Sequence, residues 1–227
     1  MAFFSNEAKE ERLNKYYDPA EIIDDQKYNM VMGGVVLEGL LVNLILCAVC
    51  KNIFETVNPI AFLIFYIICT IAGTLIARKS DNPIVSFVGY NLVVVPIGLL
   101  VSAMVNAYGG LESEVVSQAF LFTLIITGVM IAGAVFYPDF FSKLGGILLT
   151  SLVGLIIAGI VMVVMGVDSV IYSFVGAVIF SLYIGFDFWR SQQYEKTYDN
   201  AVDCALDIYL DIINLFIRIM QILGRRR

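Results

Sequence analysis

Acidic side chains recur at regular spacing in an otherwise apolar stretch near the end of the chain. Asp203, Asp207 and Asp211 follow one another at intervals of four residues, and on an α-helix this spacing puts their side chains on one face. Like charges stacked in this way repel one another, and such a face is unfavourable against lipid. We expect it to line a hydrated vestibule or to contact a cation. Asp203 and Asp207 could instead be solvated at the edge of a loop.

Four further ionisable residues stand within or at the end of apolar stretches: Glu38, Asp187, Arg218 and Arg78. An ionisable group inside a bilayer costs a few kcal/mol or more, which makes each of them a candidate functional residue. Glu38 could line a pore, or it could be an acid held by a hydrogen bond between helices. Asp187 could also be an ordinary interfacial residue. For Arg218, seven residues beyond Asp211, we expect the structural role of a counter-charge.

The composition shows that water is not the main solvent of this chain. Of 227 residues, 59% are hydrophobic and 15% charged, with a mean hydropathy of +0.86, whereas soluble domains have roughly 45–50% apolar and about 25% charged residues. A membrane span needs about 20 apolar residues. Continuous apolar runs predict helices, because barrel strands alternate with a period of two. We therefore expect an all-α integral membrane protein with seven transmembrane helices, at 30–50, 59–77, 84–105, 117–136, 146–165, 169–189 and 204–223.

The chain is expected to form one transmembrane domain. A polar segment at 1–28 precedes the domain at 29–224, and a basic tail follows at 225–227. The first segment is mixed in charge and has no apolar core of the kind that a cleavable signal peptide needs. Within it, Asp18-Pro19-Ala20-Glu21 predicts a short helix, because Asp caps helices and Pro suits the first helical position.

Basic residues predict the orientation in the membrane. With seven spans, the amino-terminal segment and the loops at 78–83, 137–145 and 190–203 share one side, which carries Lys9, Arg12, Lys15, Lys27, Arg78, Lys79, Lys143, Arg190 and Lys196. The other side has Lys51, Arg225, Arg226 and Arg227. The positive-inside rule then puts the amino terminus in the cytoplasm. The arginine tail disagrees, so a last segment that spans only part of the bilayer stays an alternative. The compact chain without organelle signals indicates a bacterial plasma membrane.

Several classes of function are disfavoured by composition. The chain has no histidine, which argues against Ser–His proteases, histidine-ligated zinc enzymes and haem-binding bundles. Its four cysteines fall in or beside apolar stretches, where cysteine packs as a small hydrophobe. The net charge of −6 disfavours nucleic acid as a partner. We expect no enzymatic activity and no cofactor.

Small residues four apart predict places where helices approach closely. Three such pairs occur in the apolar stretches: Gly73 with Ala77, Gly128 with Ala132, and Gly154 with Ala158.

Two motifs resemble the signature of a known family. The first is Ser-Leu-Tyr-Ile-Gly-Phe-Asp at 181–187, and the second is Ala-Leu-Asp-Ile-Tyr-Leu-Asp-Ile-Ile-Asn-Leu-Phe at 205–216. The pair resembles the transmembrane Bax inhibitor motif family over roughly residues 28–224. The resemblance implies six helices around a central C-terminal helix, and bacterial members of the family resemble pH-sensitive calcium leak channels. It also implies that Asp187 and Asp211 sense pH in the pore and bind calcium transiently.

The resemblance further implies an arginine latch. In the family, an arginine that ends the second helix closes onto the aspartate pair, and Arg78 occupies the matching place. Two residues depart from the family pattern. Asp207 stands where related chains tend to have a small or neutral residue, and Glu38 adds a carboxylate in the first span. Both could change the charge of the pore and its response to pH.

A passive cation leak, with calcium as the permeant ion, is the leading functional hypothesis. Calcium prefers oxygen ligands, and a pathway must bind an ion weakly enough to release it. An intramembrane aspartyl protease is an alternative, because aspartates on neighbouring helices could share a proton. The Gly-x-Gly-Asp and Pro-Ala-Leu motifs of such proteases are absent. A regulatory membrane protein is the third hypothesis. The expected partners are the lipid bilayer and cations, and protein partners stay open.

Overall fold

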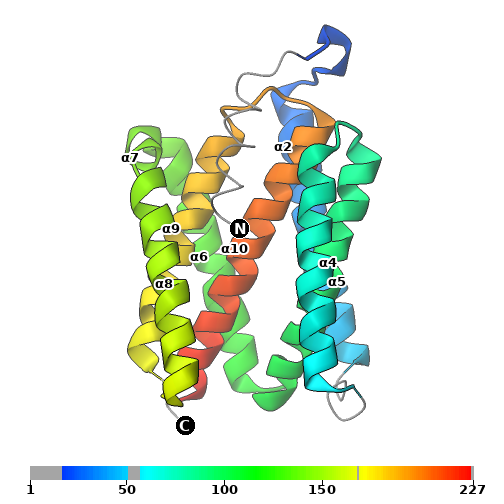
Figure 1. Cartoon of the computed structure of the whole chain (residues 1–227). Helices are drawn as coiled ribbons and strands as arrows, with labels where there is room; N and C mark the ends of the chain where they lie inside the picture. Colours follow the sequence, from blue (N-terminus) through cyan, green and yellow to red (C-terminus); the bar gives the residue numbers. More distant parts are fainter. Residues whose placement is uncertain (1–16, 51–56, 168, 226–227) are drawn as a thin grey trace. The chain divides into compact units, whose positions relative to one another are not determined.

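The computed structural model describes residues 17–50, 57–167 and 169–225, which are helical apart from short connections (Figure 1). This confirms the predicted all-α fold class. The elements in chain order are η1 (Pro19–Glu21), α2 (Asp25–Val49), α4 (Pro59–Lys79), α5 (Pro83–Ala107), α6 (Glu114–Phe136), α7 (Pro138–Ser142), α8 (Gly145–Met165), α9 (Val170–Ser191) and α10 (Tyr198–Gly224). Some basic residues that were used to predict orientation lie outside the described ranges: Lys9, Arg12, Lys15, Lys51, Arg226 and Arg227.

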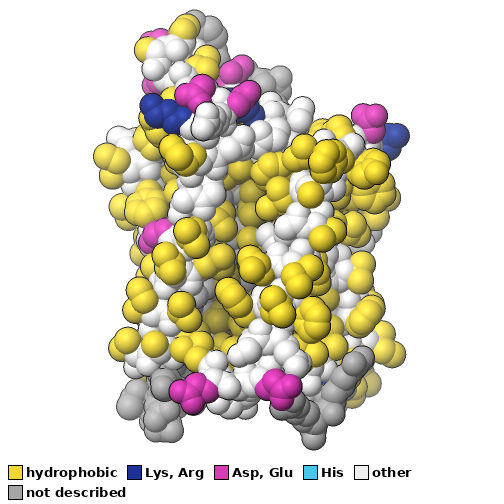
Figure 2. Space-filling model, turned by 180° about the vertical axis from the view of Figure 1, so that it is seen from behind, with side chains coloured by type: hydrophobic (Ala, Val, Ile, Leu, Met, Phe, Trp, Pro, Cys, Tyr) yellow, Lys and Arg dark blue, Asp and Glu magenta, His cyan; other side chains and the backbone are white. Residues whose placement is uncertain are grey.

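Among the described helices, six are long and apolar enough to cross a bilayer: α2, α4, α5, α6, α8 and α9. Large hydrophobic side chains on them are widely exposed, for example Ile84 at 73% and Val163 at 83%. Figure 2 shows hydrophobic side chains over the greater part of one face. Apolar surface on this scale requires lipid around it, and within lipid a helix satisfies its own backbone hydrogen bonds.

The last helix, α10, is long enough to span but differs in composition. Its 27 residues extend about 40 Å at 1.5 Å per residue. It carries four aspartates and an arginine and is not among the six apolar spans. It begins at Tyr198, ahead of the predicted start at residue 204. The early start has a local cause, because the Thr197 hydroxyl accepts a hydrogen bond from the Asn200 N–H at 3.1 Å and so caps the helix.

The contacts divide the chain into two compact units. Unit 1 comprises the described residues up to Leu111 together with Gln193–Tyr209, and unit 2 comprises Glu112–Gln192 and the chain from Leu210 onward. Unit 1 therefore contains α2, α4, α5 and the first part of α10. Unit 2 contains α6, α7, α8, α9 and the rest of α10.

In unit 1, α4 and α5 approach each other at two glycines. A Cβ atom on Gly73 would lie 2.5 Å from the carbonyl oxygen of Gly89, and a Cβ on Gly89 would lie 2.6 Å from the backbone nitrogen of Ala77. Ser86 strengthens the same contact by donating a hydrogen bond to the Ala77 carbonyl at 3.1 Å. The packing predicted for Gly73 and Ala77 is therefore confirmed.

In unit 2, a core forms around Ala134, Phe141, Leu148 and Phe186. Phe141 belongs to α7, a short helix within the predicted loop at 137–145. The glycines of the other two small-residue pairs, Gly128 and Gly154, do not make a close helix contact of the kind seen at Gly73. No atom lies within 4 Å of a Cβ built on Gly128 or on Gly154, so the close packing predicted there is wrong for the described part of the chain.

Residues before α2 contact the connection between α9 and α10 within unit 1. The predicted short helix is confirmed as the three-residue η1, in which the Asp18 carboxylate accepts a hydrogen bond from the Ala20 N–H at 2.9 Å. Ile23 then donates its N–H to the Lys196 carbonyl at 2.7 Å. The Lys196 ammonium lies 4.8 Å from the centre of the Tyr28 ring, and burial lowers the pKa of this lysine.

Candidate functional site

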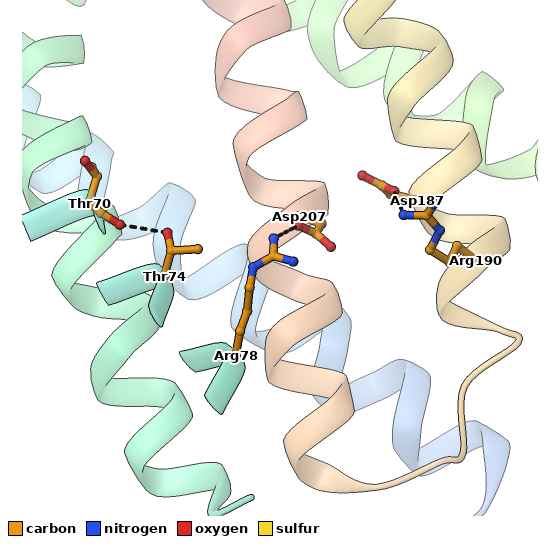
Figure 3. A network of polar contacts seen from close by, with 6 residues as sticks. All are labelled: Thr70, Thr74, Arg78, Asp187, Arg190 and Asp207. Carbon is orange, nitrogen blue, oxygen red and sulfur yellow. Dashed lines mark hydrogen bonds and ion pairs between the residues drawn. The ribbon is translucent and has the colours of Figure 1, made fainter. Parts of the chain in front are cut away.

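An ion pair joins two helices of unit 1. Arg78 lies in the last turn of α4, and its Nη2 donates to Oδ1 of Asp207 on α10 (Figure 3). Both side chains are only 15% exposed. A charge-assisted bond between partly buried groups of separate helices is stronger than a neutral hydrogen bond, so it restrains how α4 and α10 lie against each other in this unit.

Two threonines precede Arg78 on α4 at four-residue intervals. The Thr74 hydroxyl donates to the Thr70 carbonyl at 2.7 Å (Figure 3). The Thr70 hydroxyl donates to the Tyr66 carbonyl at the same distance. These bonds stay within α4. Arg78, one turn beyond Thr74, reaches α10 through Asp207.

Asp207 is the partner that the sequence reasoning did not assign to Arg78. The family resemblance implied that the arginine closes onto Asp187 and Asp211. In the structure, Arg78 forms its ion pair with Asp207, which had been noted as a departure from the family pattern. The extra carboxylate of this chain thus forms an ion pair with the arginine.

The acidic face of α10 begins one turn earlier than predicted. Asp199 precedes Asp203 by four residues, is 7% exposed, and accepts a hydrogen bond from the Ser86 hydroxyl of α5 at 2.6 Å. Sequence reasoning missed Asp199 because it placed this residue in a loop. The four-residue spacing was the signal that could have found it. Asp203, expected on the same face, is also buried, at 5% exposure.

The two signature aspartates lie in unit 2, and both are 7% exposed. Asp187 stands near the end of α9, with its Oδ1 3.8 Å from Nη1 of Arg190, one turn further along the same helix (Figure 3). The Arg190 guanidinium also lies 4.3 Å from the centre of the Phe186 ring. This ion pair is local to α9. Asp211 lies in the first turn of the part of α10 that belongs to unit 2.

Arg218 has neutral hydrogen-bond partners in unit 2. Its Nη1 donates to the Gln221 side chain at 3.2 Å, and its Nη2 donates to the Tyr172 hydroxyl at 3.3 Å. The guanidinium lies 4.5 Å from the centre of the Tyr172 ring, and its stem passes Gly176, where a Cβ would come within 2.9 Å of Nε. The described partners of Arg218, for which the sequence predicts the role of a counter-charge, are Tyr172 and Gln221.

Glu38 lies in a polar cluster of unit 1. Tyr90 and Tyr209 interact electrostatically with it and pack edge-on against each other with ring centres 5.6 Å apart. The Tyr209 hydroxyl accepts a hydrogen bond from the Asn43 amide at 2.9 Å. The Oε2 atom of Glu38 is buried and has no hydrogen-bond partner among the described residues. The hydrogen bond between helices that was considered for this acid is therefore not made by that oxygen.

Metal ligands are not gathered into a closed site in the described ranges. No three Asp, Glu or Cys side chains of those residues converge closely enough to hold an ion. All four cysteines are free thiols.

Six apolar helices with a polar, acidic α10 define a multi-pass integral membrane protein. A family model described as "Inhibitor of apoptosis-promoting Bax1" matches residues 25–227. The chain belongs to the Bax inhibitor-1 family.

Individual relatives match a shorter part of the chain. An uncharacterised protein of Helicobacter pylori strain J99 is 33% identical over 124 residues, which are 53% of this chain and 52% of the relative. A BI1-like protein of Arabidopsis thaliana is 35% identical over 118 residues, which are 49% of this chain and 46% of that protein. The chain therefore matches about half the length of these curated relatives.

Proposed function

We propose that this protein is a pH-sensitive passive leak for calcium and other cations. Asp187 and Asp211 are the pH-sensing acids of the ion path, and Arg78 is a latch on a third acid, Asp207, whose protonation opens it. The observation that carries the proposal is the ion pair between Arg78 and Asp207, since it joins α4 to α10 through groups of opposite charge. A guanidinium stays protonated at every physiological pH. The strength of the contact between Arg78 and Asp207 then depends on whether the Asp207 carboxylate is protonated.

Carboxylates supply the chemistry of the ion path. Calcium is a hard cation that prefers oxygen ligands, and acidic side chains in a channel attract it electrostatically. The aspartate face of α10 and the buried Asp187 place such oxygens in helices of a membrane protein. Membership in the Bax inhibitor-1 family is compatible with this role.

The proposed latch predicts a bell-shaped dependence of flux on pH. At high pH the carboxylates are ionised, Arg78 holds Asp207, and the path is closed. Proton binding removes the negative charge of Asp207 and weakens the contact, so α4 is released and flux rises. At still lower pH all the acids are neutral, their attraction for a divalent cation is lost, and flux falls again.

The orientation and the membrane are part of the same proposal. The excess of basic residues on the side of the amino terminus favours a cytoplasmic amino terminus, and a bacterial plasma membrane is the proposed location. The protein acts without catalysis and without a resident cofactor.

The test is ion flux through the purified protein in liposomes, with calcium and potassium compared across pH. We expect Asp187→Asn and Asp211→Asn each to change calcium flux several-fold, because each removes a charge that the ion meets. Asp139→Asn, at an exposed position on α7, is the matched control and should leave flux unchanged. Parent-like flux in both signature variants would overturn the proposal. A helical peptide enclosed in the same liposomes tests the protease alternative by its cleavage.

A further inference from the structure

Glu38 lies deep within an apolar span. It is 13 residues from Asp25 and 11 from Val49, the first and last residues of α2, which places it about 20 Å from one end of the helix and about 16 Å from the other. No other Asp, Glu, Lys or Arg follows it in α2. A carboxyl group at this depth has little access to bulk water.

Two tyrosine hydroxyls that interact electrostatically with Glu38 donate their protons to other acceptors. The Tyr90 hydroxyl, on α5, donates to the Val35 carbonyl at 2.8 Å. The Tyr209 hydroxyl, on α10, exchanges hydrogen bonds with Asn43, at 2.9 Å as acceptor and 3.2 Å as donor. Both tyrosines interact electrostatically with Glu38. Neither hydroxyl bonds to its buried Oε2, which has no donor among the described residues.

A carboxylate in this position has two ways to avoid an uncompensated charge. It can pair with a cationic side chain, or it can bind a proton. Removing an ionised carboxylate from water is energetically costly even after the protein relaxes, and a carboxylate without a partner binds a proton instead. The ion pairs of the described residues do not include Glu38, and Arg78 on α4 pairs with Asp207. Protonation is therefore the favoured state.

We propose that Glu38 is a proton-binding site of unit 1, protonated at neutral pH inside the bilayer and open to modification by a hydrophobic carbodiimide. In that reaction the carboxyl proton moves to one carbodiimide nitrogen while the carboxyl oxygen bonds to the central carbon. The resulting O-acylisourea rearranges to a stable N-acylurea, so no atom leaves. The site does not belong to the aspartate face of α10, and it does not depend on the proposed leak.

Other titratable groups near the site do not compete for the proton. Tyr90 on α5 and Tyr209 on α10 face Glu38, and Tyr66 on α4 and Cys47 on α2 act electrostatically on Tyr209. Tyrosine and cysteine side chains ordinarily lose their protons above neutral pH. The group of this cluster that can exchange a proton near neutral pH is then the carboxyl of Glu38.

The experiment is labelling of the full chain in liposomes with dicyclohexylcarbodiimide, followed by mass spectrometry of its peptides. We expect strong modification of Glu38 at neutral pH, falling at least several-fold as the pH is raised, because the ionised carboxylate does not react. Glu112, exposed in the turn before α6, is the internal control and should react weakly. In the Glu38→Gln variant, the peptide that contains residue 38 should carry no label, because glutamine has no carboxyl group. Absence of modification at Glu38 across the whole pH range, or modification that does not change with pH, overturns the proposal.

A second measurement keeps the inference testable if labelling is hindered sterically. Glu38→Gln imitates the protonated acid, so its thermal unfolding midpoint at neutral pH should equal that of the parent. A marked loss of stability at neutral pH would mean that Glu38 is ionised and paired, and would contradict the proposal. Calcium flux is not used in either measurement, and failure here is therefore distinguishable from failure of the leak.

Discussion

The two units use glycine in different ways. In unit 1, Gly73 and Gly89 bring the backbones of α4 and α5 together, and each would place a Cβ atom within 2.6 Å of a backbone atom of the other helix. In unit 2, Gly176 instead makes room for the Arg218 side chain, with a Cβ at 2.9 Å from Nε. A backbone cannot give way without moving its helix, whereas a long side chain can shift. The α4–α5 contact should therefore tolerate an added methyl group less well than the contact of Gly176 with Arg218.

The ion pairs of the two units also differ, since one joins two helices and the other lies within a single helix. Arg78 and Asp207 connect α4 to α10 within unit 1, while Asp187 and Arg190 in unit 2 are three residues apart on α9. A pair between helices constrains their relative position, and a pair within one helix does not. A change of charge in unit 1 can therefore move a helix. The following predictions test this comparison.

The largest effect is expected for Gly89→Ala. The added methyl group would press on the backbone of α4 at Ala77 and Gly73, and overpacking of this kind costs typically about 1–3 kcal/mol, occasionally more. Unfolding in detergent by a denaturant measures the loss. Gly176→Ala is the matched variant in unit 2, and it should cost less because the Arg218 stem can shift. Equal losses would show that the backbone contact is no more rigid than the side-chain contact.

A strong effect on flux is expected for Arg78→Ala. Without the guanidinium, the ion pair between α4 and Asp207 is lost at high pH, so the alkaline arm of the pH profile should disappear and flux at high pH should rise several-fold. Asp207→Asn should act in the same way, and the double variant should add little, since both changes remove one contact. The measurement is calcium flux into liposomes as a function of pH.

The control for the latch is Arg190→Ala. This change breaks an ion pair that lies within α9, so the alkaline arm should persist. If Arg78→Ala retains the full alkaline closure of the parent, Arg78 is an ordinary interfacial charge.

Helix positions could be predicted well from the sequence, because apolar runs of about 20 residues have few structures open to them in lipid. The predicted span at 84–105 corresponds to α5 at Pro83–Ala107. The start of α10 could not be predicted in the same way. Its first turn is polar, and its position depends on the cap made by Thr197. Asp199 was missed for that reason.

Residues of the candidate site could be found from the sequence, but their partners could not. The types and spacing of Arg78, Asp187 and Asp211 marked them as candidates. Which carboxylate meets Arg78 depends on how α4 and α10 pack in unit 1, and a linear pattern does not contain that information. Asp207 is the partner because it projects from α10 toward the end of α4.

The smallest effect is expected for Gly128→Ala, and this variant completes the comparison of glycines. The sequence marked Gly128 and Gly73 alike, as small residues four positions before an alanine. In the structure Gly128 is exposed on α6, and a Cβ there would meet no atom within 4 Å. The added methyl group would not clash, and alanine is favoured over glycine in a helix by roughly 0.5–1 kcal/mol. Stability toward denaturant should therefore be unchanged or slightly higher. A loss comparable to that of Gly89→Ala would mean that α6 packs closely against another helix at Gly128, such as one from a second copy of the chain.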